Sequence, residues 1–578
     1  MRVTPRTRQC LLFSPFRSTI GVKTSGLLNI PANLSSLELL AVITLPRIHP
    51  LFGRNAATCF SFVAVWCFGV VGATVCAAAA EPAGKLSGLL HNEDCTNFFY
   101  FQDFPPGKAG EIADRYVDVL AEAGVTVLFC NTNARRTNYR SDVWEAFWDG
   151  YDADGPDDQP FLTSIPKGQV KTYRKLIGNM LAVHQQGIDY PARIAAHCRR
   201  RGISPWISLR MNDVHYNDDL DHPFHGALWR KPEWFRKGHP GYYARALDYA
   251  HQEVRDHYKA LIAETLARYD IDGLELDFLR EPYLFSKGEE GKGRGILTQW
   301  LTEIRQLVDT AAARREHAIR IGVRVPSEPE TALALGLDVP AWAKDGLVDL
   351  VVVAPRWATL QYDLPLDQWR RRLGDRVTLA GGLEVRYEPY PGSPAVRMVD
   401  FDLARGAAVS VLGGGADVVY LFNYFQHGHP SWAPPEYQRV LKSFSSLDEL
   451  LKSPRRHAVT HRDVIALGEA YRPPLPATGR QISFRLPLGP APPAGCKAEA
   501  TIEVAGAQSD PAVSVNQAAA VRRGAEKLDS GSRLLTYEIP VEALAGKNDD
   551  TIAISAAEGG EIKILRVEVR IEPGEAKK

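Results

Sequence analysis

Net charge is the feature that this sequence most plainly lacks. Its 578 residues include 68 Lys and Arg and 68 Asp and Glu, so the formal charge at neutral pH is zero. Proteins that bind nucleic acids through their overall field carry an excess of basic residues. We therefore expect no nucleic-acid partner. The length suffices for one large catalytic domain and a smaller one.

Cysteine motifs are missing as well. Eight cysteines occur, and none forms a Cys-x-x-Cys pair. The four that follow residue 80 lie far apart, at Cys95, Cys130, Cys198 and Cys496. Zinc sites and the disulfide frameworks of small secreted domains need closely spaced cysteines. The sequence predicts neither.

The chain also lacks several catalytic signatures. It contains no Gly-x-Ser-x-Gly nucleophile elbow and no His-Glu-x-x-His zinc motif, which argues against the corresponding serine and metal hydrolases. Its run of three glycines, Gly413–Gly415, precedes a predicted strand, whereas a phosphate-binding loop precedes a helix. We predict no cofactor and no metal ion.

The first 80 residues do not show the pattern of a folded domain. Ala56–Ala80 is apolar and uncharged, follows Arg54, and ends in small residues before Glu81. These features are typical of a secretory signal peptide, so the sequence predicts a secreted or periplasmic protein. The apolar stretch is long for a signal peptide, and an uncleaved membrane anchor is the alternative.

Residues 81–460 alternate between strand and helix patterns. Eight such units predict a (β/α)8 TIM barrel, an α/β fold whose usual length of about 250 residues grows by insertion. The predicted strands are Asn97–Asp103, Val125–Asn131, Pro205–Asn212, Gly273–Phe278, Arg320–Val325, Asp349–Pro355, Val377–Val385 and Asp417–Asn423. The predicted helices are Glu111–Ala123, Pro191–Arg201, His251–Tyr269, Gly295–His317, Pro340–Asp345, Leu366–Leu373, Met398–Gly413 and Pro435–Lys452.

Two long insertions follow predicted strands. Residues 135–190 are rich in Trp, Tyr, Asp and Arg, and residues 213–245 contain several His and Trp. Both leave the C-terminal ends of strands, where TIM-barrel active sites lie. Loops of this length at that end usually shape a substrate cleft.

A Pro-rich junction at residues 472–476 introduces a second domain. Residues 473–574 contain short alternating segments separated by turn residues, which predicts a C-terminal all-β sandwich. We expect this domain to have a packing role. Carbohydrate binding is the alternative, although the segment contains no Trp.

The most informative segment is Gly273–Phe278. Strand side chains alternate between two faces, so Leu274 and Leu276 share one face and Glu275 and Asp277 share the other. Two carboxylates on one face are unfavourable to bury without partners. A salt-bridged structural pair is one interpretation. We favour acid–base or nucleophilic chemistry at the mouth of the barrel.

The same alternation directs polar side chains of other strands to that mouth. Arg210 and Asn212 are expected to point inward from the third strand, Arg324 from the fifth and Glu384 from the seventh. Further polar residues and one Trp lie at or just beyond the strand ends. The predicted substrate-binding residues are Arg210, Asn212, Asp213, His215, Arg280, Arg324, Arg356, Trp357 and Asn423, and the predicted catalytic residues are Asp277, Glu384 and Glu275.

Two of these acids suit glycoside hydrolysis. That reaction needs two carboxyl groups, about 5–5.5 Å apart in retaining enzymes and about 6.5–9.5 Å apart in inverting ones. The fourth and seventh strands face each other across a barrel, so Asp277 with Glu384 is our first choice. Glu275 with Glu384 and Asp277 with Asp213 are the alternatives. The arginines either keep the carboxylates ionised or bind a sulfated or uronic sugar.

Two consecutive motifs resemble a known group of proteins. Ala246–Asp256 reads Ala-Leu-Asp-Tyr-Ala-His-Gln-Glu-Val-Arg-Asp, and Tyr269–Pro282 reads Tyr-Asp-Ile-Asp-Gly-Leu-Glu-Leu-Asp-Phe-Leu-Arg-Glu-Pro. They resemble the glycosyl-hydrolase-like TIM-barrel proteins, often labelled family-10-like, of exported bacterial proteins. Gln252 stands where that group usually has Pro. The resemblance implies a barrel, carbohydrate hydrolysis, Asp277 as a catalytic candidate and Arg280 as a site residue.

These observations predict an exported glycoside hydrolase that cleaves a polysaccharide or glycan, with an anionic substrate as one option. The alternative is a non-catalytic carbohydrate-binding or structural surface protein on a barrel scaffold. Contact with a membrane is expected only if the N-terminal apolar segment stays uncleaved.

Overall fold

The computed structural model describes residues 84–94, 97–425, 435–506, 509–544, 546, 548–557 and 560–574. The predicted signal peptide or anchor at Ala56–Ala80, and the extension before it, lie outside these residues. Within the described ranges, no helix has both the length and the apolar character needed to span a membrane.

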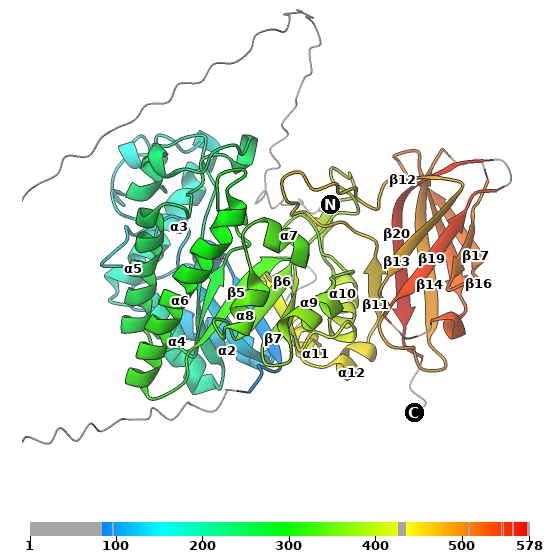
Figure 1. Cartoon of the computed structure of the whole chain (residues 1–578), viewed down its shortest axis with the longest axis horizontal. Coiled ribbons are helices and arrows are strands. Elements are labelled where there is room, and N and C mark those ends of the chain that lie inside the picture. The colour runs from blue at the N-terminus through cyan, green and yellow to red at the C-terminus, as the bar shows by residue number, and fades with distance from the viewer. Residues whose placement is uncertain are drawn as a thin grey trace, which may run out of the picture. The chain divides into compact units, whose positions relative to one another are not determined.

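A closed barrel of eight strands follows residue 88 (Figure 1). Around the barrel the strand order is β1-β10-β7-β6-β5-β4-β3-β2, and every neighbouring pair is parallel. Helices lie between the strands, so the predicted (β/α)8 barrel is confirmed. The strands are β1 (Leu89–Glu93), β2 (Val125–Asn131), β3 (Ser204–Arg210), β4 (Gly273–Asp277), β5 (Arg320–Pro326), β6 (Leu350–Ala354), β7 (Thr378–Leu383) and β10 (Val418–Phe422).

The barrel is covered by helices of very different lengths (Figure 1). They are α1 (Asn97–Phe101), α2 (Ala109–Glu122), α3 (Val170–Gln185), α4 (Tyr190–Arg201), α5 (Gln252–Arg268), α6 (Glu290–Arg315), α7 (Pro329–Ala334), α8 (Val339–Lys344), α9 (Leu366–Leu373), α10 (Phe401–Gly413), α11 (Glu436–Ser443) and α12 (Leu447–Leu451). A short ribbon of β8 (Arg386–Tyr387) and β9 (Arg397–Met398) follows β7.

The first barrel strand is not where the sequence pattern placed it. The prediction of a strand at Asn97–Asp103 is wrong, because Asn97–Phe101 forms a helix and the strand is Leu89–Glu93. The Phe-Phe-Tyr-Phe run has a high intrinsic strand propensity. Phe98, however, stacks on Tyr190 of α4 with ring centroids 5.0 Å apart. Packing of aromatic rings against a neighbouring helix thus overrides the local preference.

Three helical differences are smaller. The insertion at residues 135–190 contains the unpredicted helix α3, whose buried residues recur at the spacing of one helix face. The predicted helix Pro435–Lys452 is interrupted, since Ser446 has an extended backbone with φ −146° between α11 and α12. The connection from β5 to β6 contains α7 as well as the predicted helix at α8.

Inward-facing side chains fill the barrel, as the predicted alternation requires. An apolar cluster inside it combines Leu90, Val127, Phe129, Trp206, Leu350, Val352, Ala380, Val418, Tyr420 and Phe422. The alternate residues Ile207 and Leu209 of β3 belong to the larger core outside the barrel. An ideal Cβ on Gly273 would lie 2.2 Å from the Trp206 ring. The Asp-Gly start of β4 therefore makes room for a tryptophan.

Two antiparallel sheets form the C-terminal region, which is consistent with the predicted sandwich. The first has the order β11-β20-β14-β18-β17, with β12 also paired to β20, and the second has the order β13-β19-β15-β16. The strands are β11 (Arg455–Ala458), β12 (Ala477–Gly479), β13 (Gln481–Leu486), β14 (Lys497–Ala505), β15 (Ala512–Val515), β16 (Ala518–Ala519), β17 (Val521–Lys527), β18 (Arg533–Ile539), β19 (Asp550–Ser555) and β20 (Ile562–Glu572). Strand β11 lies inside the range predicted for the barrel.

Helix α10 of the barrel contacts these sheets closely. Ser410 donates to the backbone oxygen of Pro487 over 2.7 Å, and Asn548 donates to the backbone oxygen of Ser410 over 3.0 Å. An ideal Cβ on Gly406 would lie 2.0 Å from the backbone oxygen of Arg456 in β11. Glycine at this position lets the helix backbone approach the sheet.

Candidate active site

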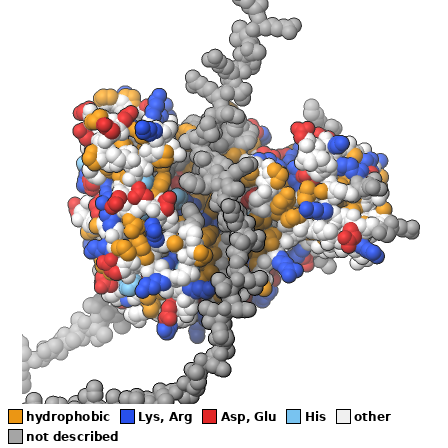
Figure 2. All heavy atoms as spheres, turned by 90° about the horizontal axis from the view of Figure 1, so that it is seen from above, with side chains coloured by type: hydrophobic (Ala, Val, Ile, Leu, Met, Phe, Trp, Pro, Cys, Tyr) orange, Lys and Arg blue, Asp and Glu red, His pale blue; other side chains and the backbone are white. Residues whose placement is uncertain are grey.

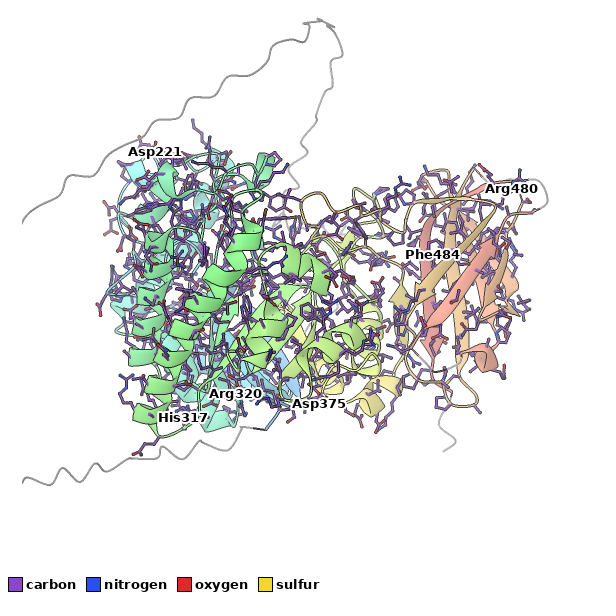
Figure 3. All side chains as sticks on the ribbon, in the orientation of Figure 1. Asp221, His317, Arg320, Asp375, Arg480 and Phe484 are labelled. Atoms are coloured by element: carbon purple, nitrogen blue, oxygen red, sulfur yellow. The ribbon has the colours of Figure 1, made fainter. Side chains whose placement is uncertain are left out.

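The predicted catalytic acids lie at the C-terminal end of the barrel. Figure 3 orients the molecule: Arg320 and Asp375, which precede or begin strands, lie at the bottom, and Asp221, in the insertion after β3, lies at the top. Strand register pairs Asp277 of β4 with Arg210 of β3 on one side and with Arg324 of β5 on the other. Asp277 therefore lies between two arginine positions at a single level of the barrel.

Arg324 contacts two of the predicted catalytic acids. Its Nε lies 3.0 Å from Oδ1 of Asp277 and its Nη2 lies 3.1 Å from Oδ2, which is a bidentate ion pair. Its Nη1 lies 3.4 Å from Oε1 of Glu384. All three residues are 2% exposed or less. Different nitrogens of one guanidinium contact the two carboxyl groups. The guanidinium of Arg324 therefore separates the carboxyl group of Asp277 from that of Glu384.

Burial strongly affects Glu384. Desolvation raises the pKa of its carboxyl to about 8, although Arg324 and Arg280 lower it. The hydroxyl of Tyr424 donates to the backbone oxygen of Glu384 over 3.2 Å and holds the residue in place. The raised pKa favours the protonated form of Glu384 near neutral pH, which suits this residue to the role of a general acid.

Glu275 lies one layer deeper, as predicted. Its Oε2 accepts hydrogen bonds from Asn92 over 2.8 Å and from the hydroxyl of Tyr420 over 3.1 Å. Burial, followed by the charge of Asp277, raises the pKa of Glu275 to about 7. Its surroundings are other barrel side chains, so its geometry favours a supporting role over direct contact with a substrate.

Asp94 is a mouth residue that the sequence prediction missed. It follows β1, whose position was predicted wrongly, and it forms an ion pair with Arg210 and a longer one of 3.7 Å with Arg280. Asn423, after β10, donates to Asp94 over 2.9 Å. Burial raises the pKa of Asp94, but Arg280 and Arg210 outweigh it and lower the pKa overall. The polar run after Leu89-Leu90 was the signal that could have located it.

A second polar cluster adjoins Asp94 through Arg210. Nη1 of Arg210 lies 2.8 Å from Asp213, and Nδ1 of His215 lies 2.8 Å from the same carboxylate. Burial raises the pKa of Asp213, but His215 and then Arg135 and Arg210 lower it well below its ordinary value. Asp213 is thus held by two arginines and by the imidazole of His215, and it does not share Arg324 with Asp277.

The remaining predicted residues differ in their surroundings. Asn212 is fully buried and donates to the backbone oxygen of Leu247 over 2.8 Å, so it holds a loop in place. Arg356 donates to the backbone oxygen of Arg280 over 3.1 Å. Trp357, by contrast, is 44% exposed. Across the described part of the chain, no group of three His, Cys, Asp or Glu side chains has the arrangement of a metal site.

The four predicted arginines are all close to carboxylates. Arg210, Arg280, Arg324 and Arg356 each lie within 4 Å of an Asp or Glu oxygen. This favours the interpretation that they stabilise charged acids over the interpretation that they bind an anionic sugar. Figure 2, seen from above, shows acidic, basic and hydrophobic side chains intermixed over the barrel, in agreement with the zero net charge.

The two long insertions line a separate pocket that is open to solvent. Its volume is about 420 Å³, and residues from both insertions line it, including Trp144, Glu145, Lys231 and Trp234. His257 of α5 also lines it and stacks on Trp144 at 4.2 Å between ring centroids. None of the acids or arginines of the barrel mouth lines this pocket.

Comparisons with known proteins give weak similarities. No family model matches the chain, and no curated protein matches it. Solved structures that resemble it include the PgaB (BpsB) glycoside hydrolase domain from Bordetella bronchiseptica, with 10% identity, 63% of this chain and 99% of that chain covered, and a TM-score of 0.37. An α-L-fucosidase from Vibrio sp. strain EJY3 has 11% identity, coverage of 82% and 89%, and a TM-score of 0.34.

A third resemblance is to the glycoside hydrolase domain of PelA from Pseudomonas aeruginosa, with 16% identity, coverage of 40% and 83%, and a TM-score of 0.27. Similarities at these TM-scores carry no argument about substrate or activity. The barrel is established by the order and direction of its own strands, and the predicted membership of a family-10-like group stays a prediction.

Proposed function

We propose that this chain is an exported glycoside hydrolase in which Glu384 is the general acid and Asp277 is the partner carboxylate. The observation that carries the proposal is the single guanidinium of Arg324, which holds these two carboxyl groups at the mouth of a closed barrel. A buried acid with a raised pKa beside a second carboxyl group at one site is what glycosidic bond cleavage requires.

The two acids suit different halves of the reaction. Glu384, whose protonated form is favoured near neutral pH because burial raises its pKa to about 8, would protonate the leaving oxygen of the glycosidic bond. Asp277, in its ion pair with Arg324, would act as the base or nucleophile. The guanidinium of Arg324 lies between the two carboxyl groups, so a sugar linkage or a water molecule can enter between them only if Arg324 moves.

Hydrolysis is tested with purified full-length protein and a polysaccharide panel that includes neutral, sulfated and uronic polymers. Release of new reducing ends is the measurement. Glu384→Gln and Asp277→Asn should each lower the rate by about 10²–10⁴-fold. Asp349→Asn is the matched control, because Asp349 accepts a backbone N–H from Ile321 at the opposite end of the barrel. Turnover of both variants at the wild-type rate would contradict the assignment.

The pH dependence offers a second check. The rate should fall as the pH rises through about 8, because Glu384 then loses the proton that it must donate. Export is supported by the sequence of Ala56–Ala80, and its test is N-terminal sequencing of the protein recovered outside the cytoplasm. A start near residue 81 is expected; recovery of the intact N-terminus in a membrane fraction would favour the anchor.

A non-catalytic carbohydrate-binding protein is the second candidate. The observation that favours it is that Asp277 uses both oxygens in hydrogen bonds with Arg324, and Oδ1 also accepts from the backbone N–H of Leu279 over 3.1 Å. Such an acid is well placed to support an ion pair. Binding to a member of the panel without release of reducing ends would favour this candidate.

A further inference from the structure

Trp357 is an exposed aromatic residue at the mouth of the barrel. Among the described residues, the large hydrophobic side chains with substantial exposure are Val143, Trp357, Val396, Leu467 and Val521, so Trp357 is the only aromatic one. It lies three residues beyond β6, at the same end of the barrel as Asp277 and Glu384. A flat indole that is open to solvent can pack against the apolar face of a sugar ring.

Arg386 covers part of this indole. Its guanidinium carbon lies 4.5 Å from the centroid of the Trp357 ring, a cation–π contact that holds the two side chains together. Arg386 follows Glu384 by two residues and comes from β8, just past the neighbouring strand β7. Indole and guanidinium therefore form one surface next to the proposed general acid.

The surroundings of the Arg386 guanidinium differ from those of the other arginines at the mouth. Each of the four predicted arginines has a carboxylate within 4 Å. No carboxylate in the described ranges lies within that distance of Arg386, which is half-buried and whose pKa is lowered by desolvation. Glu388 and Glu384 act on this guanidinium only from beyond ion-pair distance and partly offset the desolvation. A partly desolvated guanidinium with no carboxylate in direct contact favours an anionic ligand.

Asp463 fixes the loop that carries Trp357. Its carboxylate accepts three backbone N–H groups, from Arg356, Trp357 and Ala358, each over 2.8 Å. Asp463 belongs to the strap, which we define as residues 459–476 between β11 and β12. The strap is itself anchored, because the hydroxyl of Tyr283 donates to the backbone oxygen of Ile465 over 2.9 Å.

We propose that Trp357 and Arg386 form a subsite for a negatively charged sugar, a uronate or a sulfated pyranose, and that Asp463 is its positioning residue. The ring of the sugar stacks on the indole, and its carboxylate or sulfate accepts paired hydrogen bonds from the guanidinium. The inference deepens the proposed function and rests on it only in placing this sugar in the glycan that Asp277 and Glu384 cleave.

Binding is measured by affinity electrophoresis of the full-length protein in two matched pairs of polymers. Polygalacturonate is compared with methyl-esterified pectin, and dextran sulfate with dextran, so that the uronate and sulfate sources are separated. In at least one pair the anionic polymer should bind about tenfold more tightly, the gain expected from charge-assisted hydrogen bonds. Equal binding within both pairs, or no binding of the wild-type protein to any polymer, would overturn the proposal.

Substitutions test the role of each residue in binding. Arg386→Gln should abolish the preference for the anionic polymer, and Trp357→Ala should weaken binding about tenfold, whereas Trp357→Phe should restore most of it. Asp463→Asn should weaken binding in the wild-type background. In the Trp357→Ala background it should cause no further loss of binding, because Asp463 acts by fixing the loop that carries Trp357. Asp349→Asn is the control for loss of a backbone-binding carboxylate. Unchanged binding in Arg386→Gln, or full additivity of Asp463→Asn with Trp357→Ala, would contradict the assignment.

The two proposals fail in different ways. Binding of an anionic polymer that depends on Trp357 and Arg386, without release of reducing ends, would leave the subsite intact and remove the hydrolytic function. Hydrolysis at an unchanged KM in Trp357→Ala and Arg386→Gln would remove the subsite and leave the hydrolytic function intact. Both side chains reach the surface, so their truncation tests binding without disturbing the core.

Discussion

Arg324 illustrates at the residue level how the mouth of the barrel combines charge and burial. A fully buried guanidinium is unfavourable by itself, and the acids Asp277 and Glu384 are unfavourable without it. The three groups stabilise one another because they are desolvated together. The stability of the mouth and its proposed chemistry therefore depend on the same contacts.

Replacing Arg324 should be costly. Arg324→Met keeps a similar length but leaves Asp277 with an unpaired buried charge, so the free energy of unfolding should fall by about 3–5 kcal/mol. Chemical denaturation at pH 7 is the measurement. Arg320→Met, at the half-buried start of the same strand, is the control and should change stability by less than about 1 kcal/mol. A similar loss of unfolding free energy in both variants would mean that the ion pairs at the mouth stabilise the fold no more than an arginine elsewhere on the strand does.

The raised pKa of Glu384 gives a pH dependence of stability. A carboxyl with a pKa of about 8 in the folded protein, against about 4.5 in the unfolded chain, favours folding below pH 4.5 and loses this contribution as the pH rises to 8. The contribution of Glu384 should therefore decline between pH 5 and pH 8. Glu384→Gln should make the decline in stability shallower, while Glu93 and Glu275, whose pKa values are also raised, keep part of it. Urea denaturation at both pH values measures it, with exposed Glu499→Gln as the control. An unchanged slope in Glu384→Gln would contradict the assigned pKa.

At the level of single elements, β4 shows how much of the fold the sequence could predict. Its alternation placed Glu275 and Asp277 on the inner face, and register with β3 and β5 confirms this. The first strand was predicted wrongly, because Leu89–Glu93 contains no β-branched residue, whereas the aromatic run after it has strand propensity. Asp94 was missed for the same reason. Ion pairs between strands, such as those of Arg324, depend on side-chain conformations that no strand pattern specifies.

Gly273 should tolerate no side chain. Gly273→Ala would place a Cβ 2.2 Å from the Trp206 ring, and displacing that tryptophan should cost about 1–3 kcal/mol of unfolding free energy. Gly295→Ala in α6, where nothing lies within 4 Å of an ideal Cβ, should instead stabilise by about 0.5–1 kcal/mol. Thermal denaturation distinguishes them. Equal stability of the two variants would show that Trp206 can move freely.

At the level of the whole molecule, the barrel and the C-terminal sheets share contacts through α10 and β11. Gly406 brings the helix backbone against β11, and Tyr387 donates to Glu568 of β20 over 2.8 Å. Contacts of backbone against backbone are less tolerant of change than contacts between long side chains. We therefore expect the barrel and the sheets to unfold together.

Gly406→Ala tests this coupling. The added Cβ would meet the backbone oxygen of Arg456 at 2.0 Å, which should separate the sheets from the barrel. Calorimetry should show one transition for the wild-type protein and two for the variant, and limited proteolysis should cleave the variant within residues 459–476. Gly291→Ala, with free space around it in α6, is the control. Two transitions in the wild-type protein would contradict the coupling.

The position of Asp463 in the chain has a consequence for biosynthesis. The loop after β6 is complete in sequence by residue 358, yet the carboxylate that fixes it is synthesised more than 100 residues later, after every barrel strand. In a ribosome-bound chain whose barrel strands have all been synthesised, this loop would still lack the carboxylate of Asp463. A message that ends between β10 and residue 463 would leave this loop unfixed and would also remove the sheets that α10 packs against, so premature termination would affect ligand capture and folding together.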